Sequence, residues 1–176
     1  MYLENDRIRL RAPEPEDLEK YYIWENDTSL WVSGDAHLPY SRFDLKKLIS
    51  SDDAKDFYSS KQIRFTIEQK SDNEAVGAMD LFDFSPFHKR AAVGALVDNA
   101  HRKKGYAAEA MGLLCDYALR FLKLHQVYAY VPEHNTASIN MLERCGFTKQ
   151  GLLPDWLQSE NGYDSVYILS LLNRAD

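Results

Sequence analysis

The sequence contains few of the residues that build disulfide frameworks and metal sites. Only two of its 176 residues are cysteines, Cys115 and Cys145, and both lie in apolar segments with helical periodicity. The five histidines are scattered without the spacing of ligand pairs. Disulfide frameworks and structural zinc sites both need grouped Cys or His residues. We therefore expect two buried, reduced thiols and no metal.

Long apolar runs are also missing. No stretch approaches the roughly 20 apolar residues of a transmembrane helix, and residues 1–7 lack the apolar centre of a signal peptide. These features predict a cytoplasmic protein with no membrane partner. The net charge of −6 argues against nucleic acid as a partner, because duplex binding needs a broad basic face. It is compatible with a cationic ligand, and the length predicts a single domain over residues 1–176.

Most of the chain alternates between strand-like and helix-like patterns. Period-two alternation and β-branched residues predict strands, and apolar residues at steps of three and four predict helices. The strands are expected at 7–11, 63–68, 75–84, 91–97, 126–131 and 163–172, with helices after Pro13, near 43–49, over 107–122 and over 134–147.

One basic cluster lies in the turn between the predicted strand 91–97 and the predicted helix 107–122. It consists of residues 102–104 and is followed by Gly105. The first amides of a helix have no partner within the helix and carry partial positive charge, so they bind anions. Glycine lets a ligand approach the backbone closely. The stretch predicts a phosphate or pyrophosphate site, although basic residues in a turn are often simply solvated.

The type of phosphate ligand follows from the pattern around that glycine. A Walker loop needs Gly-Lys-Ser/Thr and a dinucleotide fingerprint needs three spaced glycines, and the stretch has neither. Its pattern, Arg102-x-x-Gly105-x-Ala107, resembles the acyl-CoA pyrophosphate loop of the GNAT N-acetyltransferase superfamily.

A second block strengthens this resemblance. Residues 134–147 resemble the family's closing helix, with Asn135 and Ser138 near its start and Gly146-Phe147 at its end. A plain N-cap role is the alternative for Asn135, since Asn favours that position. The Arg9-Leu10-Arg11 opening adds a likeness to RimJ/RimL-type and spermidine-type acetyltransferases.

The resemblance implies both a fold and a cofactor site. The fold is α/β (α+β), a mixed and mostly antiparallel sheet flanked by helices, in which a splayed strand pair holds acyl-CoA. Such proteins transfer acetyl from acetyl-CoA to an amine without a covalent enzyme intermediate. The positions that match the family's cofactor contacts are Ala95, Leu96, Val97, Arg102, Lys103, Lys104, Gly105, Tyr106, Ala107, Ala108, Asn135 and Ser138.

The proton-transfer groups are less clear. Many polyamine-type relatives place a Tyr five residues before the Phe of Gly-Phe to protonate the leaving thiolate, and Leu142 stands there. Tyr128 is a substitute candidate, and an ordered water is another. Deprotonating an amine of pKa near 10.4 at pH 7 costs about 4–5 kcal/mol, so a base is needed. Asp80 and Asp83 match acids of these relatives, but residues three apart face opposite sides of a regular strand unless a bulge intervenes.

By the same resemblance, residues 25–56 form the acceptor side of the site. Trp24 and Trp31, with Glu25, Asp27 and Asp35, are candidates for binding an amine by cation–π contact and charge. Trp156, in a predicted loop, is a further candidate. The alternative for these tryptophans is packing against the core.

Two functions from different classes remain open. The first is an acetyl-CoA-dependent N-acetyltransferase acting on a small amine, such as a polyamine, or on a protein N-terminus. The second is an acyl-CoA-binding sensor with little turnover, suggested by Leu142. A homodimer is common among such proteins and is a candidate assembly.

Overall fold

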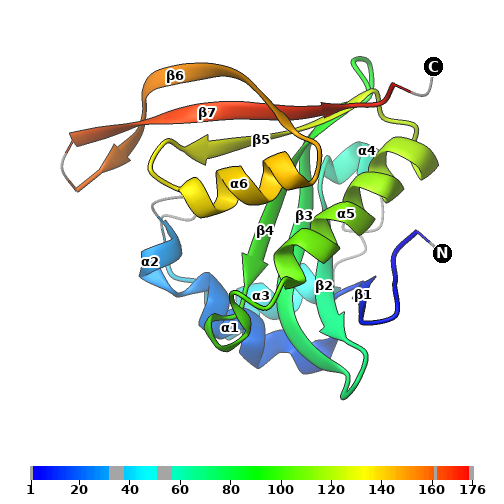
Figure 1. Ribbon diagram of the computed structural model, residues 1–176. Coiled ribbons are helices and arrows are strands. Elements are labelled where there is room, and N and C mark those ends of the chain that lie inside the picture. The colour runs from blue at the N-terminus through cyan, green and yellow to red at the C-terminus, as the bar shows by residue number, and fades with distance from the viewer. Residues whose placement is uncertain (1, 32–37, 51–56, 161, 175–176) are drawn as a thin grey trace.

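The computed structural model describes residues 2–31, 38–50, 57–160 and 162–174, except for the side chains of residues 30 and 31. A first strand is followed by a run of helices, then by three consecutive strands, and α5 and α6 separate the later strands (Figure 1). The elements are β1 (Ile8–Arg11), η1 (Pro15–Asp17), α1 (Leu18–Glu25), α2 (Thr28–Trp31), α3 (Arg42–Ser50), α4 (Phe57–Ser60), β2 (Ile63–Gln69), β3 (Glu74–Ser85), β4 (Arg90–Val97), η3 (Asn99–His101), α5 (Tyr106–Asp116), η4 (Tyr117–Phe121), β5 (Gln126–Pro132), α6 (Thr136–Arg144), β6 (Thr148–Ser159) and β7 (Gly162–Leu172).

The strands form one 7-stranded sheet in the order β1-β2-β3-β4-β5-β7-β6. All neighbours are antiparallel except β4 and β5, which run parallel. This pair is joined only from Arg90↔Gln126 to Ala92↔Tyr128, although both strands continue further. Figure 1 shows them diverging beyond this point. The predicted mixed sheet with a splayed strand pair is confirmed.

Helices cover both faces of the sheet. α5 and α6 place buried residues such as Met111, Leu114 and Ile139 in the larger apolar core, on what we call the α5 face. α1 and α3 pack Tyr21, Trp24 and Leu45 on the opposite side, the α1 face. Within the described chain, no helix is both long enough and apolar enough to cross a membrane.

Two predicted elements differ from the structure. The helix predicted over 107–122 ends as an α-helix at Asp116 and continues as a π-helical turn, η4. The loop predicted around Trp156 is wrong, because β6 runs through it. The pairing of β6 with β7 shifts between Leu153 and Leu157, where Asp155 has φ of 50°. This bulge accommodates the Pro-Asp-Trp sequence that suggests a turn.

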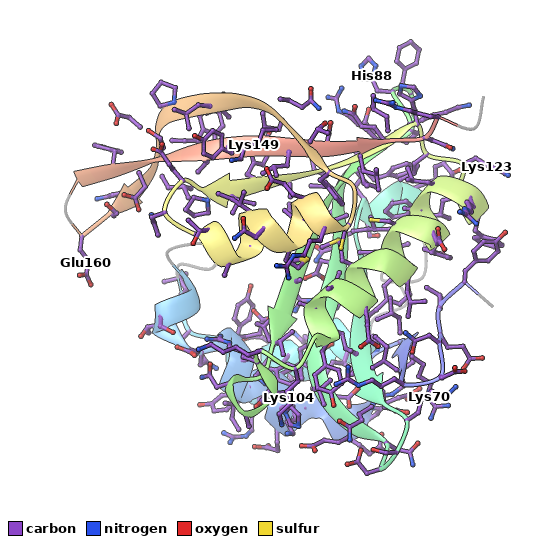
Figure 2. All side chains as sticks on the ribbon, in the orientation of Figure 1. Lys70, His88, Lys104, Lys123, Lys149 and Glu160 are labelled. Carbon is purple, nitrogen blue, oxygen red and sulfur yellow. The ribbon has the colours of Figure 1, made fainter. Side chains whose placement is uncertain are left out.

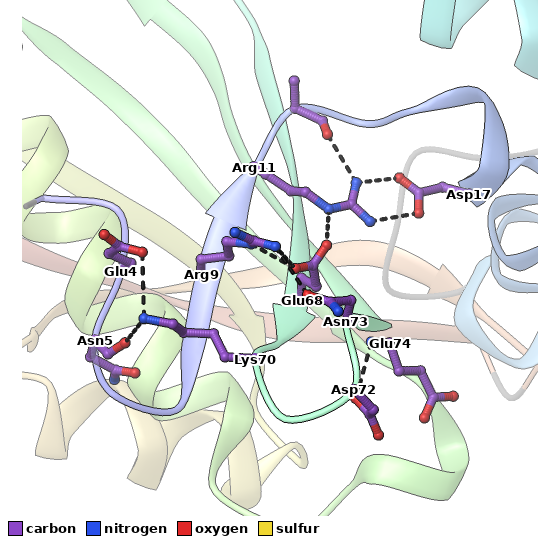
Figure 3. A network of polar contacts seen from close by, with 11 residues as sticks. Glu4, Asn5, Arg9, Arg11, Asp17, Glu68, Lys70, Asp72, Asn73 and Glu74 are labelled. Atoms are coloured by element: carbon purple, nitrogen blue, oxygen red, sulfur yellow. Dashed lines mark hydrogen bonds and ion pairs between the residues drawn. The ribbon is translucent and has the colours of Figure 1, made fainter.

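An ion network fastens the N-terminal strand to the sheet (Figure 3). Arg11 donates to both oxygens of Asp17 at 2.7 and 2.9 Å and also bonds Glu68, which Arg9 contacts from the other side. Asp17 and Glu68 are each 4% exposed. Buried carboxylates need such partners, so the network sets where η1 and α1 lie on the α1 face.

Candidate functional site

The loop between β4 and α5 has a conformation suited to anions. Asp98 accepts a hydrogen bond from the Ala100 amide at 2.9 Å and so begins the short helix η3. Lys103 and Gly105 then adopt left-handed conformations, with φ of 61° and 87°. Gly105 is the N-cap of α5, and among the described residues no side chain caps the helix there. Left-handed residues beside a helix start turn successive amides toward one concavity, which favours an anion.

The three basic side chains of this loop lie in two places, beside the start of α5 and beside the end of β4. Lys103 and Lys104 are exposed, and Figure 2 labels Lys104 at the entrance of α5. Arg102 is also exposed, but its Nε donates to the carbonyl of Val97 at 3.2 Å. The two lysines therefore remain beside the helix start, whereas Arg102 covers the end of β4.

Arg7 braces the loop from the N-terminal end of the chain. Its guanidinium donates to the carbonyl of Lys104 at 2.8 Å, pairs with Glu109 in the first turn of α5 and lies 4.4 Å from the centre of the Tyr106 ring. Tyr106 in turn donates to Gln69 on β2. The sequence predicts Arg7 only as a strand residue, because nothing local indicates a contact 97 residues away.

The end of β4 presents backbone groups to the gap between the splayed strands. The Asp98 amide donates to Val76 on β3 at 2.9 Å, and the Leu96 carbonyl also faces β3, close to Gly77. Backbone groups alternate in direction along a strand. Ala95 and Val97 therefore point their amides and carbonyls into the gap, whereas Leu96 points its own toward β3.

α6 begins shortly after β5 ends at Pro132. Asn135 is the N-cap, and its side-chain oxygen accepts from the Ser138 amide at 3.2 Å. The capping role is thus confirmed, with Asn135 and Ser138 both partly exposed. Leu142 is 2% exposed and belongs to the core of the α5 face. It offers no proton at this position.

Asp80 is neutralised by an arginine. Arg64 donates to both its oxygens at 2.8 and 3.0 Å and also pairs with Glu25. All three side chains are 20% exposed or less. Sequence patterning did not point to Arg64, since it alternates with apolar residues as any strand residue does.

Asp83 lies at a bulge that brings it to the same face as Asp80. Leu81 and Phe84 both pack in the core of the α5 face, although residues three apart lie on opposite faces of a regular strand. The extra residue is Asp83, which has φ of 50° within the register shift between Phe82 and Ser85. Asp and Asn tolerate this conformation better than most residues. The bulge that is required for Asp80 and Asp83 to face the same side is therefore present.

Tyr128 is the partner of Asp83. Its neighbours on β5 pack in the core of the α5 face, so its own side chain lies on the α1 face. Its hydroxyl donates to the Asp83 carboxylate. Burial, together with this hydrogen bond and the charge of Asp83, raises the pKa of Tyr128. The three residues Asp80, Asp83 and Tyr128 thus gather on one face.

The tryptophans separate into different environments. Trp24 is 4% exposed, packs in the core of the α1 face and donates its indole N–H to Asp98 at 2.9 Å. Trp156 is 55% exposed and stacks on Tyr130 at 6.2 Å between ring centres. The side chain of Trp31 and the whole of Asp35 lie outside the described residues.

A cavity of about 270 Å³ lies where α1 meets the end of β4. The two carboxylates that line it, Asp27 and Asp98, have lowered pKa values. Hydrogen bonds from Ser29 hold the pKa of Asp27 down. Burial raises the pKa of Asp98, but the bonds from Trp24 and the Ala100 amide outweigh it. The cavity is lined by Ile23, Trp24, Asp27, Leu96, Val97, Asp98, Asn99, Ala100 and Arg102.

The two cysteines and the possible metal ligands play no visible part in this site. Cys115 is buried in the core, and burial raises its pKa to about 12. Cys145 is partly buried, with its Sγ 3.7 Å from the carbonyl of Ala108. In the described part of the chain, no group of three or more Cys, His, Asp or Glu could hold a metal ion.

Comparison with known proteins gives consistent results. Residues 7–148 match the family model described as acetyltransferase (GNAT) domain. A spermidine N(1)-acetyltransferase of Vibrio cholerae is 28% identical over 98% of this chain and 99% of its own. A probable N-acetyltransferase of Bacillus subtilis, YjcK, is 32% identical over 66% of this chain and 65% of its own.

Solved structures of acetyltransferases have the same fold as this chain. The Vibrio cholerae spermidine N-acetyltransferase in complex with CoA and spermine superposes with a TM-score of 0.83 at 25% identity, covering 96% of this chain and 97% of that one. A GNAT-family acetyltransferase from Bacillus anthracis superposes with a TM-score of 0.80 at 20% identity, covering 98% of this chain and 99% of that one. The resemblance stated from the two sequence blocks is confirmed.

Proposed function

The chain belongs to the GNAT acetyltransferase family and transfers acetyl from acetyl-CoA to an amine, and we propose that its acceptor is a small polycationic amine of the polyamine type. The observation that carries the proposal is the cavity beside β4, which contains the carboxylates of Asp27 and Asp98. Their lowered pKa values keep both ionised at neutral pH. A second ammonium of the acceptor can bind there while the reacting amine reaches the splayed strands.

The cofactor residues fit a diphosphate and an extended arm. The amides from Gly105 to Ala108 and the ammonium groups of Lys103 and Lys104 would hold the pyrophosphate of acetyl-CoA. The backbone groups of Ala95 and the amide of Val97 would pair with its arm as a further strand would, whereas the Val97 carbonyl is bonded to Arg102; Ser138 would flank the arm. Leu96 would contribute through its side chain, which lines the cavity. Arg102 lines the cavity as well, and it would bind where the cavity meets the cofactor site.

Asp83 is the better candidate base for the reacting amine. It is exposed and has no basic side chain among its described partners, whereas Arg64 occupies both oxygens of Asp80. We assign Asp80, with Arg64 and Glu25, to positioning α1 against β3. Acetyl-CoA supplies the activated acetyl thioester, and the protein contributes orientation, which can supply much of the rate.

The proposal distinguishes three acceptor classes. Release of CoA thiol should be fastest with spermidine or spermine, slower with a monoamine of equal length, and slowest with a peptide bearing a free N-terminus. Asp27→Asn should raise KM for spermidine several-fold and leave KM for the monoamine unchanged. Asp116→Asn, a change of the same kind on the exposed side of α5, is the control. Equal kcat/KM for spermidine and the monoamine would refute the polycation assignment.

Two further outcomes test the alternatives. Tight binding of acetyl-CoA without thiol release on any amine would support the sensor function. Faster turnover of the peptide than of spermidine would support protein N-termini as acceptors. The Vibrio cholerae spermidine N-acetyltransferase has been described as a dodecamer, and we propose that this chain also forms a homo-oligomer. Light scattering during gel filtration tests the assembly.

A further inference from the structure

The hydroxyl of Tyr128 and the carboxylate of Asp83 form a hydrogen-bonded pair at the point where β4 and β5 part. The rung Ala92↔Tyr128 is the last one joining these strands. Tyr128 is 4% exposed, whereas Asp83 is exposed to solvent. One end of the pair therefore lies at the apex of the gap, and the other end contacts water.

The reaction needs a proton donor that the closing helix does not supply. Breaking the thioester leaves a thiolate, and Leu142, at the position where polyamine-type relatives often have Tyr, is buried in the core. Tyr128, on β5, lies at the apex of the gap, where β4 and β5 part. Because burial and the charge of Asp83 raise its pKa, Tyr128 keeps its proton across the working pH range.

We infer that Asp83 and Tyr128 act as one proton relay that carries the proton of the attacking amine to the leaving sulfur. This inference rests on the proposed function. The ammonium first loses one proton to solvent. As the C–N bond forms and the C–S bond breaks, Asp83 takes the second proton from nitrogen. Tyr128 gives its hydroxyl proton to sulfur and regains a proton from the Asp83 carboxyl group. Both residues end in their starting states.

The neighbourhood supports this assignment. Arg64 neutralises Asp80, so the second acid on this face is not available to accept a proton. The bulge at Asp83 turns its carboxylate toward Tyr128, a placement that a regular strand would not allow. A left-handed conformation at a residue other than glycine is costly, and such strain is often retained at functional sites.

The test is a double-mutant cycle on kcat with acetyl-CoA and spermidine. Tyr128→Phe and Asp83→Asn should each lower kcat on the order of 100-fold, within the range of general acid–base catalysis. The double variant should be no slower than the slower single variant, since residues of one relay are lost together. Tyr117→Phe and Asp116→Asn are the matched controls and should retain full activity. Calorimetric Kd values for CoA should stay within threefold of wild type.

A second measurement does not depend on turnover. In carbon-13 spectra of labelled tyrosine, Asp83→Asn should lower the pKa of Tyr128, because the carboxylate charge is removed. Asp83→Asn keeps an oxygen that can accept from Tyr128 and changes an exposed residue, so the variant should fold.

Each outcome has a defined meaning. A Tyr128→Phe variant within threefold of wild type, or losses that multiply in the double variant, would overturn the relay while leaving the acetyltransferase function intact. An unchanged Tyr128 titration in Asp83→Asn would also overturn it. A wild-type protein that binds acetyl-CoA but releases no thiol on any amine would overturn both the relay and the proposed function.

Discussion

Gly77 controls how closely β3 approaches the cofactor end of β4. A Cβ added at Gly77 would lie 2.2 Å from the Leu96 carbonyl oxygen and 3.1 Å from the Val97 Cα. Both neighbours are backbone atoms, and Cβ atoms do not approach closer than 3.0 Å. Relieving the first contact therefore needs a displacement of at least 0.8 Å, the difference between 3.0 and 2.2 Å. Gly77→Ala must push the two strands apart at the rungs Gly77↔Val97 and Ala78↔Leu96.

The expected cost is that of overpacking, about 1–3 kcal/mol. For a chain of this size, each kcal/mol shifts Tm by roughly 2–4 °C, so Gly77→Ala should lower Tm by about 2–12 °C. The displaced residues include Val97, whose backbone we assign to the cofactor arm. CoA affinity should therefore fall as well, by several-fold in calorimetry.

Gly112 provides a control with the same chemical change. It lies on the exposed side of α5, and a Cβ there would meet nothing within 4 Å. Alanine stabilises a helix interior relative to glycine by about 0.5–1 kcal/mol. Gly112→Ala should therefore raise Tm by a few degrees and leave CoA binding unchanged. If Gly77→Ala melted at or above the wild-type temperature, our account of the β3–β4 approach would be wrong.

Three further predictions follow from charged groups. Replacing Lys103 and Lys104 together by alanine should weaken CoA binding about threefold to tenfold at low salt. The difference from wild type should be smaller in 0.5 M salt, because salt screens the charges. A loss of affinity that does not depend on salt would contradict the electrostatic assignment. Arg64→Met removes the guanidinium that bonds Asp80 and Glu25 and should cost about 3–5 kcal/mol in denaturant unfolding; a loss below 1 kcal/mol would show that the trio contributes little. Burial raises the pKa of Asp17, but the bonds from Arg11 and the Glu14 amide outweigh it and lower the pKa overall. Its stabilisation is therefore complete above the unfolded pKa of about 3.9 and is lost as pH falls through the folded value; Asp17→Asn should flatten the acid side of the stability profile, and an unchanged profile would count against this.

The parts of the site that local sequence describes are the parts that could be predicted. Gly105 needs a left-handed conformation, and Asn135 caps a helix; both follow from residue chemistry within a few positions. The amphipathic pattern after Tyr106 locates α5 because helix periodicity is also local. Together with the family resemblance, these features predict the fold, and the position of the cofactor stays a prediction.

The acceptor side could not be predicted in the same way, because its contacts join distant segments. Arg64 reaches Asp80 and Glu25 across two elements, and Trp24 reaches Asp98 from 74 residues away. Asp83 and Asp155 each take a left-handed conformation that Asp permits but does not require. A sequence therefore shows where a bulge is allowed, whereas cross-strand packing determines where it forms.

The bulge at Asp83 links the fold to the chemistry. Without it, residues 80 and 83 would face opposite sides of β3, and the carboxylate at 83 would point toward the core of the α5 face. An unpaired carboxylate among Phe84, Phe57 and their neighbours would be strongly unfavourable. The same extra residue moves Phe84 into that core and Asp83 toward Tyr128. Packing of one aromatic ring and placement of one carboxylate are thus consequences of a single inserted residue. Deleting residue 83 restores the regular alternation with Phe84 still facing the core, so turnover should be lost with a much smaller loss of stability.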